Sequence, residues 1–97
     1  MDVIKNLRAE YPGEEAWQAY VHSFRPAWAQ LSNQQAYLRT FGDEDLAVVL
    51  FGQMGEHALA WFDRPYPALE GRAPSAILRD DVAGVEVIRS VLMRVPY

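Results

Sequence analysis

Apolar residues recur along the chain at the three- and four-residue steps of amphipathic helices. The breaker Tyr-Pro-Gly at residues 11–13 separates a short first helix, with Asp2 as its expected N-cap, from a second helix that begins at Glu14. The apolar stripe of this second helix comprises Trp17, Val21, Phe24, Trp28 and Leu31. Pro26 interrupts the stripe. Because proline lacks an amide hydrogen and clashes with the preceding turn, we expect a kink or break near Arg25 and a new helix from Pro26.

Two helices are expected in the middle of the chain, each with a start signal and a stop signal. Ser32 and the glutamine three residues later have the spacing of a capping box, which predicts a helix up to residue 41. Gly42 suits the stop of that helix. Asp43 is then the expected N-cap of a helix over residues 44–51.

Glycines and prolines divide the second half of the chain. Gly52 and Gly55 are expected to end the preceding helix before a short helix through Ala58, Trp61 and Phe62. Residues 63–74 hold three prolines and one glycine, but they also hold apolar residues, so we predict an ordered loop. Pro74 suits the first position of the brief helix that follows, over residues 74–78.

The last helix is predicted to begin after Asp80 or Asp81, either of which suits its N-cap, and to run to about residue 95. One arc of it is apolar and holds Val85, Val87, Ile88, Val91, Leu92 and Val95. The opposite arc holds Glu86, Arg89, Ser90, Met93 and Arg94. We therefore expect an amphipathic helix whose second arc is not needed by the core.

Together these elements predict an all-α fold, a compact bundle of about five to seven short helices with a proline-rich loop before the last ones. A length of 97 residues favours a single domain over residues 1–97. Within it we distinguish an N-terminal helical region, residues 1–47, from a second region, residues 48–97.

Composition and charge exclude several classes of function. The chain has no cysteine, which removes disulfides, thiol catalysis and thiolate zinc sites and suits the cytoplasm. Nine basic and thirteen acidic residues give a net charge of −4, so the chain alone is a poor binder of nucleic acid phosphates. No apolar run reaches membrane-spanning length and no signal-peptide pattern is present, so we expect a cytoplasmic protein.

Candidate catalytic and metal-binding residues are few. His22 and His57 lack partners at the spacing of metal ligands. The run Asp43, Glu44 and Asp45 lacks the alternating ligands and turn glycine of a calcium loop, and helix capping accounts for it. There is no nucleophile elbow and no glycine loop for phosphates. We therefore expect no catalytic residue, no metal and no cofactor, and a protein that is not an enzyme.

Aromatic and arginine side chains are the better candidates for binding. The three tryptophans are best explained as core residues. Tyr66, Met93 and Tyr97 fall in the loop, on the polar arc and in the tail, where they suit an interface. Four arginines complete the candidate set: Arg72, Arg79, Arg89 and Arg94. They form either a solvated surface or a surface for an acidic partner.

The second half of the chain also carries a specific pattern of tryptophan, proline, leucine and glycine. It reads L-F-G at residues 50–52, A-x-x-W-F-x-x-P at residues 58–65 and A-L-x-G-R-x-P-x-x-x-L at residues 68–78. Gly84 and a helix with valine and leucine follow. In these spacings residues 50–95, nearly half of the chain, resemble the toxin-binding domain of the Xre/MbcA/ParS-like antitoxins. The most specific part is residues 61–78, where several proline and glycine spacings agree at once.

The resemblance implies an antitoxin of a type II toxin–antitoxin system. Such antitoxins bind RES-domain toxins, which degrade NAD, and block the entrance to the toxin active site without catalysing a reaction. On this basis we expect toxin contacts at Tyr66, Arg72, Arg79, Arg89, Met93, Arg94 and Tyr97. We expect a structural role for Trp61, Pro65, Leu69, Gly71, Pro74 and Leu78. The resemblance also implies a homodimer or a higher assembly with the toxin.

Two alternatives stay open. One is a transcriptional autoregulator of the operon, which would bind DNA only weakly or within the toxin complex. The other is a stand-alone dimerising adaptor without catalytic activity. Many relatives carry a helix-turn-helix ahead of this domain, but residues 1–47 are acidic and show no convincing recognition helix. We therefore expect these residues to form a dimerisation region or a degenerate helix-turn-helix.

Overall fold

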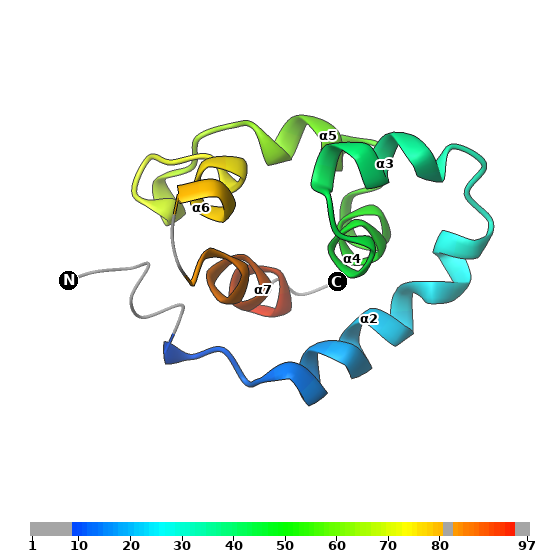
Figure 1. The fold of residues 1–97 in the computed structure, drawn as a ribbon, viewed down its shortest axis with the longest axis horizontal. Helices are drawn as coiled ribbons and strands as arrows, with labels where there is room; N and C mark the ends of the chain where they lie inside the picture. Colours follow the sequence, from blue (N-terminus) through cyan, green and yellow to red (C-terminus); the bar gives the residue numbers. More distant parts are fainter. Residues whose placement is uncertain (1–8, 81–82, 95–97) are drawn as a thin grey trace.

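The computed structural model describes residues 9–80 and 83–94, which form six complete α-helices and one 3₁₀ turn (Figure 1). They are α2 (Glu14–Ala29), α3 (Gln34–Phe41), α4 (Glu44–Met54), α5 (His57–Phe62), η1 (Pro67–Leu69), α6 (Pro74–Asp80) and α7 (Gly84–Arg94). The predicted all-α bundle is confirmed. In the part described, extended pairing is limited to an isolated antiparallel bridge between Tyr66 and Arg72. The expected first helix, capped by Asp2, lies almost entirely outside the described residues.

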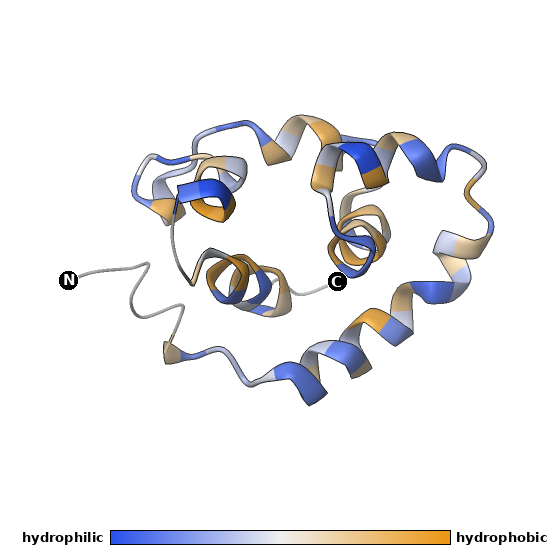
Figure 2. Cartoon of the chain, in the orientation of Figure 1, coloured by the Kyte–Doolittle hydropathy of each residue, from blue (hydrophilic) through white to orange (hydrophobic). Residues whose placement is uncertain are grey.

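Helix α4 is the centre of the bundle. Residues 46–50 are buried one after another, which is the pattern of a helix with neighbours on every side. It contacts α2, α3, α5 and α7, and Figure 1 shows α2 on one side of it and α3 and α5 on the other. Figure 2 shows the same contrast in hydropathy, with α4 largely apolar and α2 carrying many polar residues. Asp43 caps α4 as predicted, since its carboxylate accepts a hydrogen bond from the Asp45 amide at 3.0 Å.

One face of α2 packs on α4. Four residues of the predicted stripe lie on this face: Trp17, Val21 and Trp28 are buried, and Phe24 is half-buried against the core. The fifth, Leu31, lies beyond the end of α2 and is also half-buried against the core. Gly52 permits the close approach, because a Cβ there would overlap the Phe24 ring and lie 2.9 Å from the Phe24 Cβ. The predicted stop at Gly52 is therefore wrong. Helix α4 continues to Met54, and Gly55, with a φ of 59°, ends it.

The expected break at Pro26 is also wrong, because α2 runs without interruption from Glu14 to Ala29. Pro26 has no amide hydrogen to donate to the His22 carbonyl, four residues earlier. Both residues are exposed, so water is able to donate a hydrogen bond to that carbonyl instead. Beyond the proline, Trp28 is 4% exposed and belongs to the core. Burial of the Trp28 ring holds the last turn of α2 in place.

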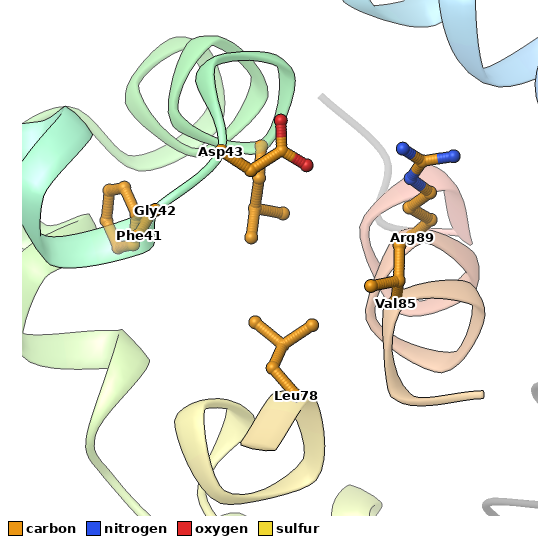
Figure 3. A pocket seen from close by; sticks show the side chains of 7 residues that line it. Phe41, Gly42, Asp43, Leu78, Val85 and Arg89 are labelled. Atoms are coloured by element: carbon orange, nitrogen blue, oxygen red, sulfur yellow. The ribbon is translucent and has the colours of Figure 1, made fainter. Parts of the chain in front are cut away.

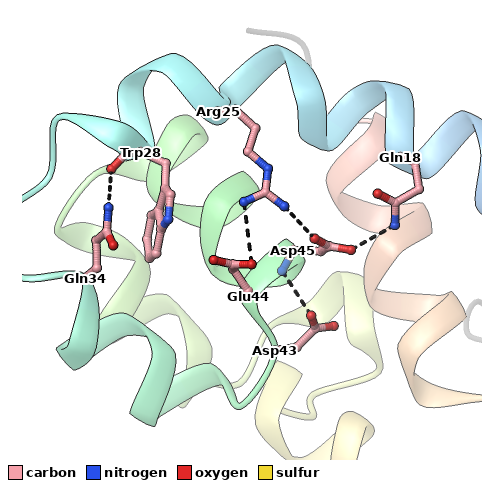
Figure 4. Close-up of polar contacts among 7 residues, drawn as sticks. All are labelled: Gln18, Arg25, Trp28, Gln34, Asp43, Glu44 and Asp45. Atoms are coloured by element: carbon pink, nitrogen blue, oxygen red, sulfur yellow. Dashed lines mark hydrogen bonds and ion pairs between the residues drawn. The ribbon is translucent and has the colours of Figure 1, made fainter.

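The capping box predicted at Ser32 does not form. Helix α3 begins at Gln34 with Asn33 as its N-cap residue, and no side chain caps it. The Gln34 side chain instead donates from Nε2 to the Trp28 carbonyl at 2.8 Å, which ties the turn between α2 and α3 (Figure 4). The predicted end of α3 is confirmed, since Gly42 follows its last residue in the left-handed region.

The last two helices pack closely against each other. Helix α6 begins at Pro74 as predicted and extends to Asp80, so Asp80 is not the N-cap of α7. The alternative cap, Asp81, lies outside the described residues. Helix α7 begins at Gly84, where a Cβ would overlap the Ile77 carbonyl oxygen of α6. A glycine at this position therefore allows the two helices to touch through their backbones.

This close contact sets the rotation of α7 about its axis. Val87, Ile88 and Leu92 are buried as predicted. Two residues on the edges of the predicted arcs are placed wrongly: Val85 is 46% exposed, whereas Ser90 is 1% exposed.

Across residues 9–80 and 83–94, no helix combines the length with the apolar character that a membrane-spanning segment needs.

Candidate functional site

The proline-rich segment between α5 and α6 is an ordered turn. The Tyr66 amide donates to the Arg72 carbonyl at 3.2 Å, and the Gly71 amide donates to the Tyr66 carbonyl at 2.9 Å. Gly71 has a φ of 77°, which a glycine adopts without strain. Glu70 has a φ of 58°, an unusual value for a residue with a side chain. The turn is therefore closed by backbone hydrogen bonds at both of its ends.

The six residues expected to hold this region together occupy different environments. Leu69 and Pro74 are buried, whereas Trp61 and Leu78 are half-buried and Pro65 is exposed. The Trp61 ring lies 5.9 Å from the Tyr66 ring, so the loop packs on α5 through this pair. Leu69 reaches the core and fixes the other side of the turn.

The residues expected to contact a toxin do not form one cluster. Tyr66 and Arg72 share the proline-rich turn. Arg79 lies at the end of α6 and pairs with Asp80 at 3.1 Å. Met93 is half-buried and packs against the core. Tyr97 lies outside the described residues.

Arg89 is not on a face that the core can spare, contrary to the prediction. Its side chain is only 14% exposed, and its guanidinium carbon lies 4.9 Å from the centre of the buried Trp17 ring. Arg89 Nη1 donates to the Tyr11 hydroxyl at 3.0 Å and to Glu14 Oε1 at 2.8 Å. Burial opposes the charge, but the hydrogen bonds to Glu14 and Tyr11 outweigh it and raise the pKa of Arg89.

The N-terminal segment meets α7 at two ion pairs. The first is the pair of Arg89 and Glu14, and hydrogen bonds from Gln18 and Arg89 lower the pKa of Glu14 below its ordinary 4.5. The second joins Arg94 Nη1 to Glu10 Oε2 at 2.7 Å, and both of its side chains are more than half exposed. These contacts join positions more than seventy residues apart, so no pattern within a single helix predicts them.

A pocket of about 230 Å³ opens beside Arg89. Its apolar lining comes from Phe41, Leu46, Leu78 and Val85, and Gly42 contributes backbone. Figure 3 shows Val85 and Arg89 together on α7, Leu78 on α6, and the Asp43 carboxylate across the opening from Arg89, at the start of α4. The pocket therefore lies where the corner between α3 and α4 meets α6 and α7.

The acidic run at the start of α4 joins this helix to α2 (Figure 4). Asp45 Oδ1 accepts a hydrogen bond from Arg25 Nη2 at 3.0 Å, and Asp45 Oδ2 accepts one from Gln18 Nε2 at 2.8 Å. Arg25 Nη1 also lies 3.6 Å from Glu44 Oε2. With Asp43 as the helix cap, every carboxylate of the run has a partner within the fold. Throughout the described residues, no group of three or more side chains of the types that bind metals is placed to hold an ion.

A buried polar cluster joins α2, α4 and α7 through residues that the sequence pattern does not single out. Gln53 is 7% exposed and donates from Nε2 to the Tyr20 hydroxyl and, at 2.7 Å, to the Leu92 carbonyl. The Tyr20 hydroxyl donates to the same carbonyl at 3.1 Å. The residue four positions after Leu92 is Pro96, which has no amide hydrogen to offer. Tyr20 and Gln53 therefore supply the donors that a helix would otherwise provide.

Searches of protein families, of curated proteins and of solved structures found no match to this chain.

Proposed function

We propose that the chain is an antitoxin that binds a RES-type, NAD-degrading toxin and obstructs the entrance to its active site. The observation that carries the proposal is the geometry of residues 65–74. The spacing Leu-x-Gly-x-x-Pro, on which the resemblance to this antitoxin class rests, here has a definite structural use. Leu69 is buried, Gly71 supplies a left-handed turn and Pro74 starts a helix.

Binding by this turn is favoured because it is ordered before a partner arrives. Backbone hydrogen bonds close it on both sides of Gly71, and prolines 65, 67 and 74 restrict the backbone of the unfolded chain. A surface that is already ordered loses little conformational entropy on association. Tyr66 and Arg72 are half-buried within the turn and belong to residue types that are enriched at interfaces.

The proposed action is binding without catalysis, in the cytoplasm and as a homodimer or a higher assembly with the toxin. The described carboxylates of the acidic run are occupied in capping α4 and in pairing with α2, which supports a structural role for them. The acidic net charge of −4 supports a partner other than DNA for the chain alone.

The experiment is co-expression of the chain with the product of the adjacent gene, expected to be a RES-type toxin. We expect the two proteins to co-purify and cellular NAD to be preserved. Gly71→Ala should weaken the complex, because an alanine at this φ strains the turn. The control is Gly55→Ala, which also places a side chain at a positive φ, here at the end of α4, and should leave binding unchanged. A RES toxin that depletes NAD fully in the presence of the folded chain would overturn the proposal.

A further inference from the structure

The pocket between the corner of α3 and α4 and the helices α6 and α7 is continuous with exposed apolar surface. Val85 lies at its edge and is 46% exposed. Within the described ranges it is the one large hydrophobic residue that is exposed. Leu78 is half-buried beside it, and Leu46 closes the floor from the core. Covering this surface with another apolar group would remove it from water and stabilise the covered state.

The size and lining of the pocket favour a protein side chain as its occupant. Its volume of about 230 Å³ is below the roughly 300 Å³ at which small-molecule sites usually begin. Apart from Asp43 and Arg89 at the opening, its lining side chains are apolar, which suits a bulky apolar side chain such as leucine, methionine or phenylalanine.

The charged residues at the pocket opening indicate which group of the partner lies next to that apolar side chain. Arg89 is held in place by the buried Trp17 ring and is 14% exposed, but its carboxylate partner Glu14 is 64% exposed. The cation therefore stays where it is when Glu14 leaves, and Glu14 is the exchangeable member of the pair. Arg89 Nε is also buried without a hydrogen-bond partner among the described residues. Asp43 lines the pocket from another element, so like-charge repulsion leaves the Arg89 side of the opening as the place that favours a partner carboxylate.

We infer that this pocket receives one bulky apolar side chain from a partner, and that a carboxylate beside that side chain replaces Glu14 on Arg89. The inference rests on the proposed function, with the RES-type toxin as the partner. Glu14 then acts as an internal competitor, which occupies Arg89 in the free protein and is displaced on binding. Arg89 is thus paired with a carboxylate both in the free protein and in the complex.

Two variants with opposite expected effects test this inference by isothermal titration of the purified chain with the toxin from the adjacent gene. Val85→Glu places a charge at the edge of the pocket, four residues before Arg89, and should weaken binding about tenfold or more. Its matched control is Ala60→Glu, at an exposed position of α5. Glu14→Gln weakens the internal competitor and should tighten binding about two- to fivefold. Its matched control is Glu15→Gln, the next residue of α2.

Circular dichroism checks that each variant keeps its helices. Both shifts together, with unchanged controls, support the inference. It is overturned if the wild type binds the toxin and Val85→Glu binds as tightly as Ala60→Glu, or if Glu14→Gln does not bind more tightly than the wild type. A wild type that shows no binding overturns the proposed function itself, and the inference with it.

Discussion

Arg89 and Trp17 form a stacked pair that joins the first and last helices of the described fold, with 4.9 Å between the guanidinium carbon and the indole centre. Trp17 is fully buried, so Arg89 covers part of the core as well as carrying a charge. Replacement of Arg89 by leucine should lower the free energy of unfolding by about 1–3 kcal/mol, because the cation–π contact and the hydrogen bonds to Tyr11 and Glu14 are lost.

Urea unfolding followed by circular dichroism measures this effect. Arg79→Leu is the matched control, since the Arg79 side chain is 71% exposed and should change stability by less than about 0.5 kcal/mol. Equal stability of the two variants would mean that the stacking of Arg89 on Trp17 contributes nothing.

Glu14 makes stability depend on pH in the acid range. Hydrogen bonds from Gln18 and Arg89 lower the pKa of Glu14 in the folded protein below its ordinary 4.5. A lowered folded pKa stabilises the protein above 4.5, and this stabilisation is lost as the pH falls through the folded pKa. We therefore expect wild type to be more stable than Glu14→Gln near neutral pH, and the difference to shrink at about pH 3.

Urea unfolding of both proteins at the two pH values checks this prediction. Direct titration of the Glu14 carboxyl by NMR gives a second readout, in which Gln18→Ala should move its pKa upward. A stability difference that is the same at both pH values would contradict the assignment of Glu14 as a hydrogen-bonded carboxylate.

Tyr20 and Gln53 share one acceptor, the Leu92 carbonyl. In Tyr20→Phe or Gln53→Met the carbonyl keeps one donor, so each change should cost about 0.5–1.5 kcal/mol. The double variant leaves the carbonyl without either donor and should cost about 1 kcal/mol more than the sum of the single changes. A double-mutant cycle from urea unfolding measures this coupling, and strict additivity would show that the two donors act independently.

Gly52 and Phe24 mark the closest approach of α2 and α4. Gly52→Ala should destabilise the fold by about 1–3 kcal/mol, because the added Cβ meets the Phe24 ring and the Phe24 Cβ. A Phe24→Ala background removes the ring but keeps the Cβ at 2.9 Å, so the same change should cost less there, and the better helix propensity of alanine offsets part of the remaining loss. Thermal unfolding of the four proteins tests this, and an equal cost of Gly52→Ala in both backgrounds would rule out the overlap as its cause.

Helix ends were predictable where a single residue decides the local backbone. Asp43 caps α4, Gly42 takes a left-handed conformation after α3, and Pro74 begins α6. Each of these signals acts over three or four neighbouring residues, so it can be recognised from the sequence alone. The exceptions have tertiary causes, since Pro26 stays within α2 because the following turn carries the buried Trp28.

The candidate site was harder to predict because its geometry depends on long-range contacts. A helical wheel places Arg89 on the polar arc of α7, but the residue lies over Trp17 and bonds to Tyr11, which is 78 positions away. The exposure of Val85 follows from the backbone contact between Gly84 and Ile77. Neither relationship has a signal within one helix, so periodicity assigns both residues to the wrong environment.

The central claim is that the chain inhibits a RES-type toxin by binding it. The most direct measurement is the rate of NAD degradation by the purified toxin of the adjacent gene as the chain is added in increasing amounts. The account predicts that the rate falls in proportion to the chain added and reaches zero near a fixed stoichiometric ratio. Unchanged NAD degradation with an excess of correctly folded chain would contradict it.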